Sequence, residues 1–99
     1  MAKPNTYDVG DKVRFAVNIQ VSDADTDPTT LTFRHKYPDG TSADDLVWGT
    51  DVELVRDSAG DFHVDLIVSR VGDHFYRWVA TGNAHGAEER RFIIRPTEF

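Results

Sequence analysis

The sequence has no cysteine and no long apolar run, and each of these absences excludes a class of protein. Without cysteine the chain forms neither a disulfide scaffold nor a cysteine-ligated zinc site. No window approaches the roughly 18 apolar residues that a membrane-spanning helix needs, so we expect no membrane partner. A chain of 99 residues fits one domain, and its core must come from hydrophobic packing alone.

Basic residues are also scarce. Lysine and arginine number 11 against 17 aspartates and glutamates, which gives a net charge of -6. Nucleic-acid binding depends largely on neutralising phosphates with basic side chains, and an anionic membrane surface selects for the same residues. We therefore expect neither partner. Residues 1–6 are polar and show no signal-peptide pattern, so we expect no export by a signal peptide. The absence of cysteine suits a protein that folds in the cytoplasm.

What the sequence does contain is a regular alternation of apolar and polar residues, which is typical of strands with one buried face. Such strand patterns lie at residues 12–21, 31–37, 46–48, 52–56, 61–69, 74–81 and 87–95. Turn signals separate them at intervals of roughly 8–12 residues, as in β-sandwiches. We predict an all-β, immunoglobulin-like sandwich of about seven antiparallel strands. It occupies residues 7–99, after a flexible arm of residues 1–6.

Aromatic residues mark the expected core of this sandwich. In immunoglobulin-type sandwiches a tyrosine stands two residues before a cysteine in a late strand. Here Tyr76 is followed two residues later by Trp78, so an apolar ring takes the place of the disulfide. The alternative is that both are core aromatics of another β-fold. The predicted core is Phe15, Phe33, Phe62, Leu66, Tyr76 and Trp78.

A run of alternating aspartates, Asp23, Asp25 and Asp27, is a weak candidate for a calcium site. An EF-hand loop also requires glycine at its sixth position and glutamate at its twelfth. Those positions hold Pro28 and Arg34, so this is not an EF-hand. The alternative is that these loop carboxylates cap turns in solvent.

Other residues with reactive side chains form no known motif. The four histidines, His35, His63, His74 and His85, show no metal-binding spacing. His63 lies on the polar face of its strand pattern, and it comes near His74 only if their two strands pair. Ser69 lacks the surroundings of a nucleophilic serine. We therefore predict no cofactor, no metal beyond the weak calcium candidate, and no enzymatic activity.

Three aromatic residues are candidates for recognition rather than packing: Trp48, Phe75 and the C-terminal Phe99. An exposed aromatic ring is a common anchor in binding surfaces. Each of the three is also compatible with a place in the core.

Several segments together resemble a family of small immunoglobulin-like proteins encoded among the virion genes of tailed phages and prophages. The matching segments are YDVGDKVRF, DPTTLTF, PDGT, VRDSAGDFHVDL, VGDHFYRW and FIIRPTEF. Members typically begin with Tyr-Asp-x-Gly-Asp and carry Tyr-Arg-Trp in a late strand, and both patterns are present here. Asp25 and Asp27 depart from the family, whose members more often have small residues and glycine in that loop.

The resemblance implies a capsid decoration protein that binds the outer surface of the phage head, with the major capsid protein or other virion proteins as partners. The protein would be made in the host cytoplasm and end on the virion. Tyr7, Asp8 and Asp11, in the entry turn, are the expected contact residues. Two alternatives are a component of the tail or head–tail connector and a module that binds host-surface glycans weakly.

Overall fold

The computed structural model describes residues 6–96, which consist of strands and the turns between them. No helix among these residues is long and apolar enough to cross a membrane. The strands are β1 (Thr6–Asp8), β2 (Lys12–Asn18), β3 (Gln20–Val21), β4 (Ala24–Asp25), β5 (Thr30–Lys36), β6 (Leu46–Val47), β7 (Leu54–Ser58), β8 (Asp61–Ile67), β9 (Gly72–Thr81) and β10 (Gly86–Arg95).

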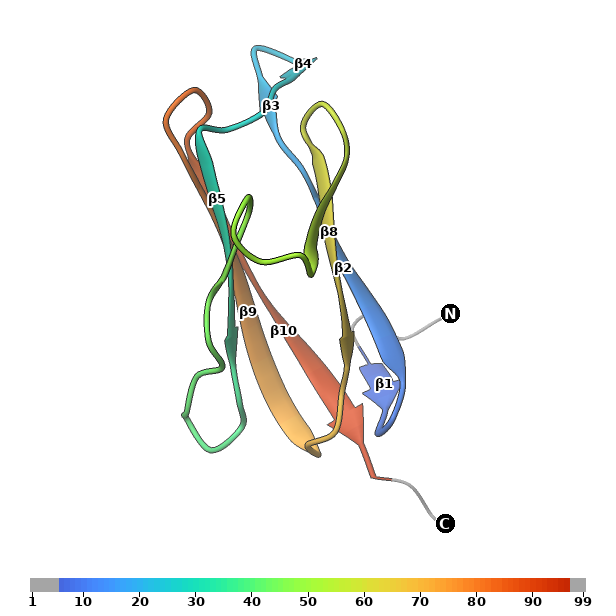
Figure 1. Ribbon diagram of the computed structural model, residues 1–99. Coiled ribbons are helices and arrows are strands. Elements are labelled where there is room, and N and C mark those ends of the chain that lie inside the picture. The colour runs from blue at the N-terminus through green and yellow to red at the C-terminus, as the bar shows by residue number, and fades with distance from the viewer. Residues whose placement is uncertain (1–5, 97–99) are drawn as a thin grey trace.

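The strands form two larger sheets that face each other and a small hairpin at one end (Figure 1). One sheet has the order β1-β10-β9-β5-β6, and the other has the order β2-β8-β7. All pairs are antiparallel except β1 with β10. The fold is therefore all-β, with the layered arrangement of a β-sandwich. The expected count of about seven strands is not confirmed, because short strands are added at the sheet edge and in the β3–β4 hairpin.

Aromatic side chains from both sheets fill the space between them. Phe15 of β2 packs against Phe33 of β5 and Phe92 of β10, with ring centroids 5.6 and 5.0 Å apart. Of the six predicted core residues, the structure buries Phe15, Phe33, Phe62 and Trp78 and half-buries Leu66 and Tyr76 against them. Burial of these rings contributes the largest share of the hydrophobic stabilisation.

The long strand expected over residues 12–21 ends early. The N–H of Ile19 donates to the carbonyl of Gly60 (2.8 Å), and the carbonyl of Ile19 accepts from Thr26 (3.0 Å). These bonds turn the chain away from β2 and into the β3–β4 hairpin, whose turn residues Ser22 and Asp23 have positive φ. Val21, the last residue of the expected strand, is exposed as a result.

Other strand boundaries also differ from expectation, and β9, for example, begins at Gly72 rather than at residue 74. The strand expected at residues 52–56 is β7, which begins two residues later because the N–H of Leu54 closes a turn onto Asp51 (3.2 Å). At the start of the chain, Thr6 was expected in the flexible arm but pairs with Ile93 in β1. This pairing also covers Ile93, which is half-buried. Residues 1–5 lie outside the described part.

Candidate docking surface

The entry turn between β1 and β2 is held tightly at one end of the sandwich. The N–H of Asp8 donates to the carboxylate of Asp11 (2.9 Å), and Gly10 takes the left-handed conformation that the turn requires (φ +94°). Gly10 also donates to the carbonyl of Val68 (2.7 Å), and Val68 donates back to the carbonyl of Asp11 (3.0 Å). The turn is thus fixed to the β8–β9 connection.

The three predicted contact residues have different positions. Tyr7 is half-buried and its ring lies edge-on to Phe92, with centroids 6.2 Å apart, so it belongs mainly to the core. Asp8 and Asp11 are exposed. Asp8 also pairs with Arg95 (2.8 Å). Only the two aspartates are therefore placed to meet a partner with their side chains.

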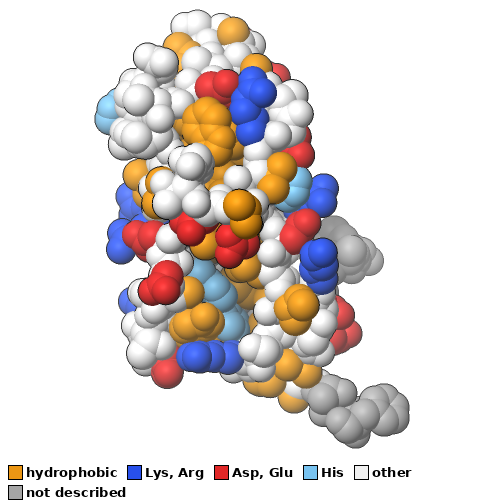
Figure 2. Space-filling view, in the orientation of Figure 1, with side chains coloured by type: hydrophobic (Ala, Val, Ile, Leu, Met, Phe, Trp, Pro, Cys, Tyr) orange, Lys and Arg blue, Asp and Glu red, His pale blue; other side chains and the backbone are white. Residues whose placement is uncertain are grey.

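Two exposed apolar residues stand beside this turn. Ile67 is 70% exposed at the end of β8, and Val71 is 51% exposed in the β8–β9 connection. We call Asp8, Asp11, Ile67 and Val71 the entry end. Figure 2 shows apolar side chains at this lower end of the molecule. The sequence contained one indication of this surface, because Ile67 is an apolar residue on the polar face of an alternating strand pattern.

A pair of histidines that the sequence did not predict lies between the sheets. His74 is buried, and its Nε2–H donates to the carbonyl of Arg70 (2.6 Å). In the tautomer with this single proton, the Nδ1 of His74 accepts a hydrogen bond from the Nε2–H of His35 (2.9 Å). Figure 2 shows histidine side chains at the floor of a hollow on this side.

The hollow is a cleft of about 160 Å³ whose lining includes Phe33, Leu46, Leu66 and both histidines. At its rim the guanidinium of Arg70 lies 3.9 Å from the centre of the Tyr37 ring. Burial, the neighbouring His74 and Arg70 together lower the pKa of His35 to about 4. Asp44 also lines the cleft, but the hydrogen bonds that the structure gives the two rings run to each other and to the carbonyl of Arg70.

We predict that acid destabilises the protein through His35. Its pKa falls from 6.5 unfolded to about 4 folded, so stability is full above pH 6.5 and declines as the pH falls toward 4. The loss is on the order of 1–2 kcal/mol, because water still reaches part of the ring. Urea unfolding of the parent and of His35→Gln at several pH values measures it. Parallel pH profiles for the two proteins would contradict the assignment.

His63 occupies a different environment from the one expected. It was predicted on a solvated face but is only 8% exposed, because β8 is the central strand between β2 and β7. Its Nδ1 lies 2.7 Å from Asp57. It does not approach His74 through strand pairing, since β8 and β9 belong to different sheets.

The three loop aspartates do not converge on one point. Asp25 accepts hydrogen bonds from Asn18 (3.1 Å) and Gln20 (3.0 Å), which lower its pKa. Asp27 accepts from Arg56 and from the N–H of Gly60 (2.8 Å), and both bonds lower its pKa. Within residues 6–96, no three His, Asp or Glu side chains are grouped to hold a metal. Asp25 and Asp27 instead tie the β3–β4 hairpin and the segment after it to neighbouring strands.

The candidate aromatic residues also separate by position. Trp48 is half-buried and edge-on to Phe62, with centroids 4.8 Å apart. Tyr76 packs against Phe15 and Phe33, and burial raises the pKa of its phenol. Phe75 alone is exposed, on the outer face of the five-stranded sheet. Phe99 lies outside the described residues.

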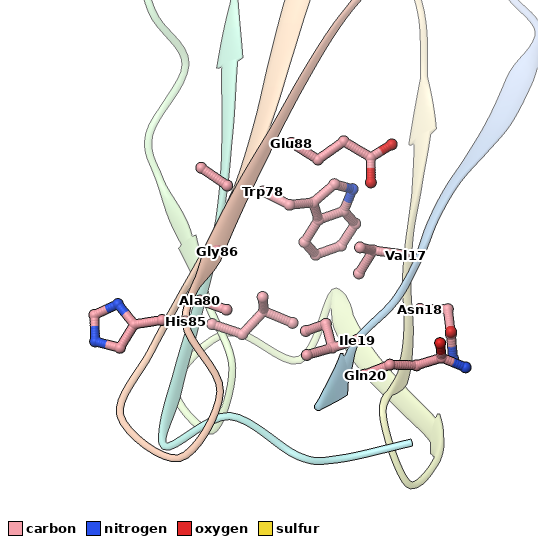
Figure 3. Close-up of a pocket in the computed structure, with 11 residues that line it drawn as sticks. Val17, Asn18, Ile19, Gln20, Trp78, Ala80, His85, Gly86 and Glu88 are labelled. Atoms are coloured by element: carbon pink, nitrogen blue, oxygen red, sulfur yellow. The ribbon is translucent and has the colours of Figure 1, made fainter. Parts of the chain in front are cut away.

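Trp78 stands beside a second cavity at the open side of the sandwich. The cavity, of about 190 Å³, is lined by residues that include Val17, Ile19 and Glu88 (Figure 3). The indole Nε1 is buried without a hydrogen-bond partner among residues 6–96. Figure 3 shows Trp78 pointing into the space between β9 and β2, so its ring joins the two sheets.

The chain was compared with known protein families, curated proteins and solved structures, and it matches none of them. Its function is therefore inferred from the surfaces and the fold described above.

Proposed function

We propose that this chain is a structural protein of a phage virion, an immunoglobulin-like domain that decorates the outer surface of the head by binding the major capsid protein. The observation that carries the proposal is the entry end. There, exposed Ile67 and Val71 lie next to a turn whose backbone is fixed by hydrogen bonds. A rigid surface with exposed apolar residues is suited to binding another protein, because little conformational entropy is lost on contact.

The strand order supports an immunoglobulin-like sandwich. In that fold, strands C, F and G form one sheet, B, E and D lie in the other, and additional strands extend the first. Assigning β2 as B, β5 as C, β7 as D, β8 as E, β9 as F and β10 as G reproduces this arrangement. β6 then takes the place of C′, and β1 lies on G as an early strand.

The shape of the domain also supports attachment by one end. The entry turn and the β5–β6 and β8–β9 connections gather at one end, and the β3–β4 hairpin with the β9–β10 loop lies at the other (Figure 1). Burying two aliphatic side chains such as Ile67 and Val71 contributes about 1.5–3 kcal/mol each. The binding free energy of one such contact is modest. Repeated sites on a symmetric shell increase the overall affinity when neighbouring copies of the protein also contact each other.

The location and copy number of the protein on particles test this function. Particles are purified from lysates of cells that carry this gene and its neighbouring virion genes, then quantified by mass spectrometry and imaged. Many copies spread over the head are expected. A few copies at one vertex or on the tail would instead establish the connector or tail alternative. Absence from the particles would overturn the virion proposal.

We expect the double substitution of Ile67 and Val71 by aspartate to abolish binding to the head. Charged side chains at these positions remove the apolar contact and place unpaired carboxylates in the interface. Undecorated particles are mixed with purified protein, and co-sedimentation gives the bound fraction. Val52→Asp is the control, because Val52 is 89% exposed and belongs to the β6–β7 connection rather than to the entry end.

Unchanged melting temperatures would show that both variants remain folded. Equal binding by the parent, the double variant and the control would exclude the entry end as the docking surface.

A further inference from the structure

The outer face of the five-stranded sheet carries an exposed aromatic residue between two cations. Cross-strand register aligns Phe75 of β9 with Lys36 of β5 on one side and Arg91 of β10 on the other. Because side chains alternate along a strand, all three point away from the core, and all three are exposed. Phe75 is 41% exposed, the only phenylalanine, tyrosine or tryptophan among residues 6–96 with so large an exposed surface.

Some cations of this face form ion pairs with neighbouring carboxylates and others do not. In the next row, Arg34 lies 3.4 Å from Asp45, and Arg77 lies 3.6 Å from Glu89. Neither Lys36 nor Arg91 makes an ion pair within residues 6–96. Two such cations beside an exposed ring stand out in a chain of net charge -6. Their charges are available to an incoming partner.

A shallow groove adjoins the Phe75 ring and gives the surface its shape. Its volume is about 320 Å³, and its lining includes Arg34, Lys36, Ser42, Phe75, Arg77 and Glu89. The groove combines an apolar side chain with donors of hydrogen bonds and positive charge. It therefore offers room for an apolar side chain and for a carboxylate next to it.

From this geometry we infer that the face centred on Phe75 binds an acidic segment of a partner protein, with an apolar residue between two carboxylates. Neighbouring strands lie about 4.8 Å apart, so the Cα atoms of Lys36 and Arg91 are about 10 Å apart. In an extended segment, residues four apart are separated by about 13 Å, which the long lysine and arginine side chains reach. The apolar residue between them then covers Phe75.

Charges on the same face favour a polypeptide over nucleic acid. Asp73 and Glu89 lie on the outer side of β9 and β10, among the cations. A continuous run of phosphates would be repelled by Asp73 and Glu89. A peptide with two separate carboxylates can reach the cations without approaching these two acidic side chains. The surface is distinct from the entry end, and the inference does not depend on the proposed virion role.

Peptide titration of the isotope-labelled protein, followed by NMR, tests the inference. The probe is an extended peptide with one leucine between two glutamates, each separated from it by a single alanine. We expect shifts centred on Phe75, with weak affinity, because each exposed ion pair contributes only about 0.2–1 kcal/mol. Lys36→Glu is expected to weaken binding at least ~3-fold, and combining it with Arg91→Glu at least ~10-fold. Phe75→Ala removes the apolar contact and should weaken binding without a change in charge.

Lys12→Glu is the matched control, because Lys12 is an exposed strand lysine on the other sheet. It changes the net charge as Lys36→Glu does and is expected to retain full binding. If Lys12→Glu and Lys36→Glu lost the same peptide affinity, the peptide would be responding only to net charge, and the inference would be overturned. So would the absence of peptide-induced shifts at millimolar peptide, or tighter binding of a DNA oligonucleotide of equal charge. Melting temperatures confirm that each variant is folded.

Discussion

Trp78→Ala is expected to lower the free energy of unfolding by about 3–5 kcal/mol, the usual loss for a large buried aromatic residue. Trp78 is 2% exposed, and its ring packs edge-on to Phe33 with centroids 4.8 Å apart. The cavity beside it already leaves space between the sheets, so few neighbouring side chains are placed to fill the new gap. Urea unfolding at neutral pH measures the loss.

The size of this effect is large relative to the whole protein. A small domain is typically stable by about 5–15 kcal/mol, so the substitution removes a major part of that stability. Trp48→Ala is the matched control, because Trp48 is the other tryptophan and is only half-buried. We expect it to cost about 1–2 kcal/mol. Similar midpoints for Trp78→Ala and the parent would contradict the central place given to Trp78 in the core.

Gly60→Ala is expected to cost about 3 kcal/mol, for a reason that involves the backbone rather than the core. Gly60 has φ +76°, which side chains disfavour, and an added Cβ would lie 2.5 Å from the carbonyl oxygen of Ile19 and 2.9 Å from the nitrogen of Thr26. Both are backbone atoms, so neither can rotate away. The substitution therefore opposes the bonds that end β2 and begin the β3–β4 hairpin.

Gly40→Ala separates the steric part of this loss from the conformational part. Gly40 has a similar positive φ of +90°, but no atom lies within 4 Å of its added Cβ. Only the left-handed conformation opposes alanine there, so we expect a loss of about 1 kcal/mol. Urea unfolding compares the two variants. Equal losses would mean that the contact of residue 60 with Ile19 and Thr26 is not close in solution.

The entry end and the face centred on Phe75 serve different kinds of contact. The first is a small apolar surface beside a fixed turn, and the second combines an aromatic ring with two cations. A domain attached by its entry end keeps the face of its sheet free. The two sets of variants therefore test the two surfaces separately, since Ile67 and Val71 lie in neither row of that face.

The alternating pattern was sufficient to predict an all-β chain, and four of the six residues predicted for the core are buried. Phe15, Phe33 and Trp78 point inward because a strand places every second side chain on the same face, and these positions share the apolar face of their strands. This information is local, so it can be read along the sequence. The local pattern fails where a distant residue forms a hydrogen bond with the strand. The N–H of Ile19 donates to the carbonyl of Gly60, and the strand predicted there is too long.

The tertiary structure alone decided which of these strands are neighbours, and with that the candidate sites. His35 and His74 are 39 residues apart, and they meet only because β5 and β9 pair in one register. The same register brings Lys36 beside Phe75. Ile67 likewise reaches the entry turn through the pairing of β2 with β8. Alternation fixes which face a side chain takes, but it does not choose the neighbouring strand or decide between registers two residues apart, because these bury the same side chains.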